Sequence, residues 1–288
     1  MTENDDKKGD ALQQQRFQML KDIAGELSGD INFPTNFNLI IQLRETLNDP
    51  DWDLNDVVKL LSVEPLISSR LVGLANSAAY KRGKAEIGDL ATAVKKLGIN
   101  LVRTTAFGIA TKQFLNARSM SVFSDISQWY WDHSLRTASA ASVVNRHHGR
   151  FPPDMALLAG LIHDIGAFYL LYRASKYDEL CKRPETVKYL IAQWHESMGH
   201  ALLNALGLPE QLTEAIKEHD CPRAVAPVQL KTMADLVYVA NILAGVEEEW
   251  RYIDGIDVVP SPDMLDEKFS SLGEEIEQQY LELRAAFA

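Results

Sequence analysis

The sequence has very little cysteine, with only Cys181 and Cys221 in 288 residues. So few thiols exclude a disulfide framework and a cysteine-rich zinc site. Long apolar runs are also missing, since none reaches the roughly 18 uninterrupted residues that a membrane helix needs. The first fifteen residues, MTENDDKKGDALQQQ, are polar and lack the apolar segment of a secretory signal peptide. These absences predict a cytoplasmic protein that contacts no membrane.

Basic residues are in deficit, with 29 Lys and Arg against 40 Asp and Glu and a formal net charge of −11. Most of the excess lies in residues 247–288, which hold 12 acidic and 3 basic residues. The rest of the chain has 28 acidic and 26 basic residues and is nearly neutral. Neither part offers the basic surface that binds nucleic acid or an anionic membrane. We therefore expect no nucleic-acid partner.

Strand patterns are absent as well, because no segment alternates apolar and polar residues between turn signals. Apolar residues instead recur at helical spacing in segments of about 10–15 residues that are separated by short turns. Asp89 is placed to cap a helix from Leu90 to Leu97, which Gly98 would end. The pattern predicts an all-α protein, a multi-helical bundle.

The C-terminal region predicts an amphipathic helix with an acidic outer face. Ser261 and Pro262 are typical of a helix start. Gly273 is placed to divide the region into two short helices. Two interpretations stay open, a helix that packs on the core and a helix that binds a partner. The apolar stripe recurs at spacings of three and four residues, at Leu265, Phe269, Leu272, Ile276, Tyr280, Leu283 and Phe287.

The most apolar stretch, residues 155–171, carries a single polar pair, His163-Asp164. A segment of this composition is expected to be buried together with that pair. An unpaired buried carboxylate costs several kcal/mol or becomes protonated. A metal ion, a cationic partner or a set of hydrogen bonds must therefore satisfy Asp164.

A series of motifs in fixed order resembles the HDOD family, bacterial output and signalling domains related to the HD metal-dependent phosphohydrolases. Leu74-Ala-Asn-Ser77 and Ala93-Val-Lys-Lys-Leu-Gly98 resemble the N-terminal half of that domain. In the second half the matching segments are 195–209, 214–220 and 233–244. The family's Ala-Ile-x-x-His-His ends here in His219-Asp220, so an aspartate stands at the second histidine. The resemblance spans roughly residues 31–250.

The resemblance implies an N-terminal helical subdomain packed against an HD-like helical core. We expect a disordered tail at 1–15, the subdomain at 16–120, the core at 121–255 and an acidic helical extension at 256–288. A serine-rich stretch, 116–127, predicts a linker between the two halves. A long helix is then expected from about Trp129 to His147.

The resemblance also implies a metal pocket on the core helices. Imidazole and carboxylate donors suit Mn, Fe, Ni or Mg. An acidic ligand of the family falls at position 241, where this chain has a neutral Asn, so a divalent ion should be held less firmly. The alternative is a metal-free network in which histidine and aspartate side chains satisfy each other through hydrogen bonds and water. The pocket residues would be His133, His163, Asp164 and Asn241, with His195 and His219 as additional members.

Catalysis would need more than ligands. Phosphohydrolase relatives follow the dyad with Ile-Gly-Lys, whereas this chain reads Ile165-Gly166-Ala167 and has no cation until Arg173. Phosphoryl transfer relies on positive groups to neutralise developing charge. We therefore expect a signalling or regulatory protein that acts through unknown protein partners and is not an enzyme. The alternative is a metal-dependent phosphohydrolase acting on a nucleotide or another phosphoester.

Asn76 and Ser77 are the surface residues through which the resemblance implies contacts in the N-terminal half. The alternative is that both simply hold a helix end through bonds from side chain to backbone.

Overall fold

The computed structural model describes residues 38–77, 86–115, 117–223, 225–246, 250–253 and 259–287, together with 14, 17–19, 21–22, 25 and 80. These residues form α-helices and two short 3-10 helices and contain no strand. The predicted all-α fold is therefore confirmed. The predicted tail at 1–15, apart from Gln14, lies outside the described residues.

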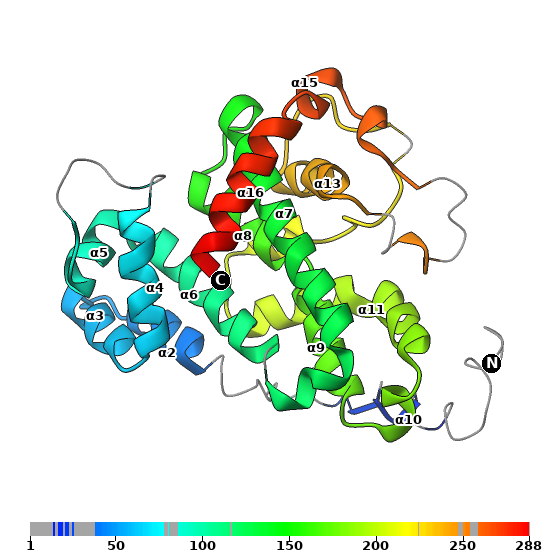
Figure 1. Ribbon diagram of the computed structural model, residues 1–288, viewed down its shortest axis with the longest axis horizontal. Helices are drawn as coiled ribbons and strands as arrows, with labels where there is room; N and C mark the ends of the chain where they lie inside the picture. The colour runs from blue at the N-terminus through cyan, green and yellow to red at the C-terminus, as the bar shows by residue number, and fades with distance from the viewer. Residues whose placement is uncertain are drawn as a thin grey trace.

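The N-terminal helices form a group on one side of the molecule (Figure 1). Capping side chains fix their starts. Asp53 forms a capping box with Asp56, and Asp89 accepts from the backbone N–H of Thr92. Gly98, with φ 79°, ends the helix that Asp89 begins, as predicted. The group consists of α2 (Asn38–Asn48), α3 (Leu54–Ser62), α4 (Pro65–Asn76), α5 (Leu90–Leu97) and α6 (Ile99–Leu115). Helices α2, α4 and α5 pack on α6, and α3 packs on α2, α4 and α5.

In the rest of the core, α7 packs on α8 and α13, while α9 packs on α11. Two of these contacts need glycine. A Cβ at Gly160 would lie 2.6 Å from the Cα of Ala138, and one at Gly166 would meet the backbone of His195. These close approaches bring the polar residues of different helices together. The helices are α7 (Ser124–His148), α8 (Pro153–Ile162), α9 (Ile165–Ala174), α10 (Asp178–Cys181), α11 (Pro184–Ala205), α12 (Glu210–Ala215) and α13 (Met233–Ala244).

The predicted linker at 116–127 is wrong. A 3-10 helix, η2 (Arg118–Phe123), runs directly into α7 at Ser124, five residues before the expected start near Trp129. Met120 and Phe123 are both buried and anchor this turn in the core. The serine-rich composition indicated a linker, but the burial of these two apolar side chains holds the segment in the core.

The C-terminal region begins with η3 (Pro262–Met264), followed by α15 (Glu267–Ser270) and α16 (Gly273–Phe287). The division at Gly273 is therefore confirmed. Helix α16 packs along α7 and reaches α4 and α6 (Figure 1). Most of its apolar stripe is buried, so this helix packs on the core.

One stretch, Pro153–Ala174, is long and apolar enough to cross a membrane, with a mean hydropathy of 1.6. It spans α8 and α9 and is 89% buried within the fold. Its composition therefore reflects a place in the protein core. Cys181 and Cys221 are both free thiols, as the sequence predicts.

Candidate metal centre

The break between α8 and α9 places His163 and Asp164 at the centre of the molecule, where both side chains are 0% exposed. Four other predicted residues meet them there, and a further aspartate, Asp220, joins them. We call this set the His/Asp cluster. Its other members are His133 in α7, His195 in α11, His219 and Asp220 after α12, and Asn241 in α13, all buried.

Three of the histidines are oriented by backbone carbonyls. The Nδ1 atoms of His163, His195 and His219 lie 2.7–2.8 Å from carbonyl oxygens of Gly160, Ile191 and Ile216. A carbonyl only accepts, so each Nδ1 carries a proton and donates it. In the neutral imidazole, Nε2 is then left with a lone pair. This is the arrangement in which surrounding groups usually hold a metal-binding histidine.

The three Nε2 atoms converge on Asp164. That of His163 lies 3.1 Å from Oδ2. Those of His219 and His195 lie 3.3 Å and 3.6 Å from Oδ1. The Nε2 atoms of His195 and His219 are 3.1 Å apart. Two lone pairs at that distance need a shared proton or a cation between them.

The cluster also holds polar atoms that the protein itself does not satisfy. Nε2 of His163, Oδ2 of Asp164 and Oδ2 of Asp220 are buried and have no hydrogen-bond partner. The close approach of His163 to Asp164 therefore lacks the direction of a hydrogen bond. Buried unsatisfied atoms are costly and call for an explanation such as a bound ion. Imidazole nitrogen and carboxylate oxygen are suitable ligands for divalent transition metals.

The cluster contains two groups of three residues, and within each group the donor atoms lie close enough together to bind one ion. The first is His133, His163 and Asp164, and the second is Asp164, His195 and His219. Within each group all the ligand atoms lie within 4.8 Å of one another. The residues present therefore fit a metal ion, and Asp164 is common to both groups.

Asn241 binds two members of the cluster. Its Nδ2 donates to Oδ1 of Asp220 at 2.8 Å, which turns its Oδ1 toward Nε2 of His133 at 2.7 Å. That nitrogen must then carry a proton to donate. The ring of His133 stacks on Trp129 with centroids 5.2 Å apart, and Trp250 donates to Asp220 at 3.0 Å. The Asn at position 241 thus occupies Nε2 of His133 instead of adding a ligand charge.

Asp220 supplies the carboxylate that position 241 lacks. Its Oδ2 lies 3.2 Å from Nε2 of His195. The sequence interpretation noted Asp220 only as a departure from the family motif and gave it no role. The signal was present, because His219-Asp220 repeats the His-Asp dipeptide of 163–164.

The turn that presents His219 and Asp220 is strained. Glu218 has φ 58°, a left-handed conformation that only a glycine adopts easily, and it is the one such non-glycine in the described chain. The Glu196 carboxylate accepts from the backbone N–H groups of Glu218 and Asp220 at 3.1 Å and 3.0 Å. Strain of this kind is typical of functional sites whose surroundings enforce it.

Burial and the neighbouring charges together shift the pKa values of the cluster. Burial, and then the charge of His163, lower the pKa of His133 to about 4. Burial opposes protonation of His219, but the charge of Asp220 and a hydrogen bond to Asp164 outweigh it and raise that pKa to about 10. Burial opposes ionisation of Asp220 too, yet the charge of His219 lowers its pKa to about 2. Without a metal, histidine protons must balance the carboxylates.

Neither position at which the sequence analysis looked for a cation supplies one to the cluster. Position 167, a lysine in phosphohydrolase relatives, is a buried alanine. Arg173 pairs with Asp22, its Nη2 3.8 Å from Oδ2. In the described part of the chain, no lysine or arginine forms an ion pair with Asp164 or Asp220. Among the described residues, the carboxylates of the cluster therefore form ion pairs with histidines alone.

Asn76 and Ser77 lie away from the cluster. Asn76 donates to the carbonyls of Val72 and Ile87 and accepts from the N–H of Ile87. Ser77 donates to the carbonyl of Leu74 at 2.8 Å. These bonds hold the end of α4.

Solved structures share this fold. A crystal structure from Shewanella amazonensis SB2B, named as a candidate metal-dependent phosphohydrolase, is 24% identical with a TM-score of 0.69 and covers 96% of this chain and 100% of its own. An HDOD domain protein of unknown function from Geobacter sulfurreducens is 23% identical with a TM-score of 0.57. It covers 94% of this chain and 98% of its own. At these identities the likeness shows the fold alone.

An uncharacterized protein of Treponema pallidum (strain Nichols) is 23% identical over 262 residues, 85% of this chain and 46% of the relative. The chain thus spans about half the length of that relative. The family model for the HDOD domain matches residues 33–222, well over half of the chain. The motifs, the helical fold and this match agree, and the chain belongs to the HDOD family.

Proposed function

We propose that this protein is a regulatory HDOD protein in which the His/Asp cluster stabilises the core and contacts with another protein carry the function. One observation carries the proposal: all seven side chains of the cluster are at most 3% exposed. A phosphoester substrate would have to reach the ligand atoms to react. Trp129 and Trp250 pack directly against the cluster.

A divalent ion suits the cluster in this role. Mn, Fe, Ni or Mg would add the positive charge that lets two carboxylates be buried among neutral imidazoles. His163, His195, His219, Asp164 and Asp220 would hold it. Structural metal sites contribute directly to folding free energy, because the unfolded chain has no preformed site.

The alternative function is a metal-dependent phosphohydrolase. The unsatisfied donor atoms of His163, Asp164 and Asp220 favour it, as does the name of the Shewanella relative. The lack of an ion pair between a described lysine or arginine and Asp164 or Asp220 opposes it, because phosphoryl transfer needs cations on the transferred group.

One experiment separates the two functions. The full chain is purified without chelator, analysed for bound metal, and assayed with added Mn on phosphomonoester and phosphodiester substrates. We expect bound metal, a lower thermal midpoint after chelation, and no turnover. Turnover well above background that His163→Ala abolishes would overturn the regulatory proposal. If no turnover is found, capture of a protein partner is compared between the wild type and variants of exposed residues. The variants that lose the partner identify the binding surface.

A further inference from the structure

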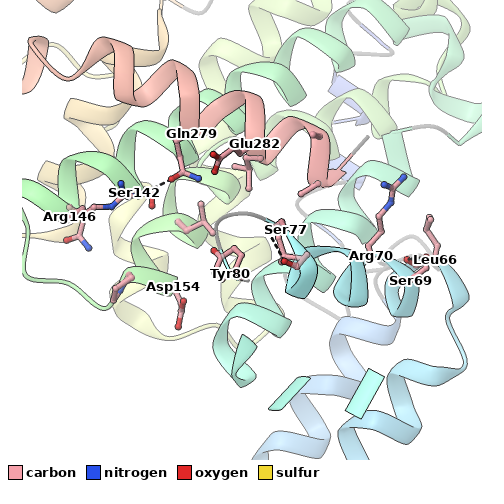
Figure 2. Close-up of a pocket in the computed structure, with 18 residues that line it drawn as sticks. Leu66, Ser69, Arg70, Ser77, Tyr80, Ser142, Arg146, Asp154, Gln279 and Glu282 are labelled. Carbon is pink, nitrogen blue, oxygen red and sulfur yellow. Dashed lines mark hydrogen bonds between the residues drawn. The ribbon is translucent and has the colours of Figure 1, made fainter. Parts of the chain in front are cut away.

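A cavity of about 800 Å3 lies away from the His/Asp cluster, between segments far apart in the sequence (Figure 2). Helix α4 forms one wall, the end of α7 and the start of α8 form another, and α16 closes it. No member of the cluster lines it. Ligand pockets typically have volumes of about 300–1,000 Å3 and lie where separate structural units meet.

The floor of the cavity is apolar. Leu74, Leu157 and Leu283 line it and also line a narrower recess behind it, which leads to Leu161 and Phe287. An apolar body of moderate size would therefore find matching surface at the base of the cavity.

One end of the cavity carries negative charge. Asp154 is partly buried, and burial raises its pKa. In the described chain its carboxylate has neither a hydrogen-bond nor an ion-pair partner. Burial, and then the charge of Asp154, also raise the pKa of the Tyr80 hydroxyl. Glu282 of α16 lines the same cavity.

The arginines of the cavity do not neutralise Asp154. Arg146 is engaged by α16, donating to Glu275 at 2.6 Å and Gln279 at 2.9 Å. Arg70 lies at the opposite end of the cavity from Asp154 (Figure 2). Among the described residues the carboxylate of Asp154 therefore has no ion-pair partner, although Arg146 lies near enough to Tyr80 for its charge to lower the pKa of that hydroxyl.

Gly73 gives an independent reason to expect a ligand. It lies inside α4, where glycine costs roughly 0.5–1 kcal/mol relative to alanine. Its φ is not positive, and a Cβ there would meet no atom within 4 Å. Neither backbone conformation nor packing explains the glycine. Because it lines the cavity, its missing side chain leaves room for a molecule to approach the backbone.

We propose that this cavity binds a small amphiphilic cation, with its amine at Asp154 and Tyr80 and its apolar body on the leucine floor. The inference does not depend on the regulatory function or on any metal in the cluster. Three compounds with the same indole ring, side chains of similar length and different charge serve as probes: tryptamine, neutral 3-ethylindole and anionic indole-3-propionate.

Isothermal titration of the full chain with each probe tests the proposal. We expect tryptamine to bind about tenfold tighter than the other two, the usual effect of one charge-assisted hydrogen bond. Asp154→Asn should remove that preference, and Asp51→Asn, a matched change at an exposed turn, should leave it intact. Equal affinity for all three probes, or binding of none, would overturn the proposal.

A second variant tests the location. Gly73→Met should fill the cavity and weaken tryptamine at least tenfold, while the thermal midpoint stays equal or rises, because a helical glycine is replaced. Unchanged tryptamine affinity in the folded variant would place binding elsewhere and contradict the inference.

Discussion

At the residue scale, the cluster has a neutral amide at Asn241 and a carboxylate at Asp220. Asn241 occupies the position at which the family resemblance implies an acid, and Asp220 supplies the charge from the turn after α12. The two side chains are joined by a bond of 2.8 Å. Motifs assign ligands by position along the chain, so the neutral side chain of Asn241 predicted weaker binding of a divalent ion. They gave Asp220 no role: the repeated His-Asp dipeptide hints at one, but the approach of Asp220 to the other ligands depends on the left-handed turn at Glu218.

Asp220→Asn tests whether this aspartate belongs to the centre. The change keeps the shape but removes a charge, so we expect metal affinity to fall about 10–100-fold and stability to fall by about 1–3 kcal/mol. Metal titration and chemical denaturation measure the two effects. Asp51→Asn is the control, and equal losses in both variants would contradict the assignment.

Asn241→Asp tests whether a carboxylate at position 241 would contact a bound ion. The new carboxylate would lie against Asp220, and two like charges at this distance cannot both stay ionised without a cation. We expect the metal-free variant to have a lower thermal midpoint than the wild type, and added Mn to raise it more than it raises the wild type. Equal responses to Mn would show that position 241 does not contact the ion.

At the element scale, capping residues and apolar periodicity predicted the helices whose ends are set by the local sequence. The helix at 90–97 and the division at Gly273 follow directly from Asp89, Gly98 and Gly273. The linker failed because Met120 and Phe123 are two isolated apolar residues among serines, and their burial under α7 and α9 is a tertiary effect. For the same reason, the sequence left open whether the C-terminal stripe packs on the core.

A pair of variants in α16 measures how that helix is held. Glu275 bonds Arg146 and His147 at the surface, and exposed pairs of this kind contribute about 0–1 kcal/mol. Phe287 is buried against α6, where its ring would meet a Cβ at Gly108. We expect Phe287→Ala to cost about 3–5 kcal/mol and Glu275→Gln less than about 1 kcal/mol by chemical denaturation. The reverse order would show that charge, not packing, holds α16.

At the scale of the whole molecule, one continuous apolar core joins the two halves, with α6 packed against both. Helix α7 carries the cluster and the cavity on opposite faces, since His133 and Ser142 are nine residues apart, about half a turn out of phase. Helical periodicity predicted the all-α fold, and the family resemblance implied six residues that the structure places in the cluster. The cavity was not predicted, because it depends on how α4, α8 and α16 meet.

The charge balance of the cluster predicts how stability depends on pH in the chelator-treated protein. The pKa of His219 is raised from 6.5 to about 10, so its contribution is complete below pH 6.5 and is lost as the pH rises toward 10. The pKa of His133 is lowered to about 4, so its contribution is lost as the pH falls from 6.5 toward 4.

We therefore expect the metal-free protein to be most stable near neutral pH and to lose on the order of a few kcal/mol toward about pH 9.5. Thermal midpoints measured across that range with chelator, and again with Mn, check this. Added Mn should flatten the alkaline decline, because an ion takes the place of the histidine proton. An alkaline decline of equal size in both series would contradict this account of the cluster.

The burial of the cluster has a kinetic consequence. An ion enclosed by α7, α9, α11 and α13 could leave only when those helices part, so its release rate would equal the rate of local opening. A stronger chelator would then remove the ion no faster than a weak one, and raising the chelator concentration would soon reach a plateau. The time taken to strip the protein would report the frequency at which its centre opens.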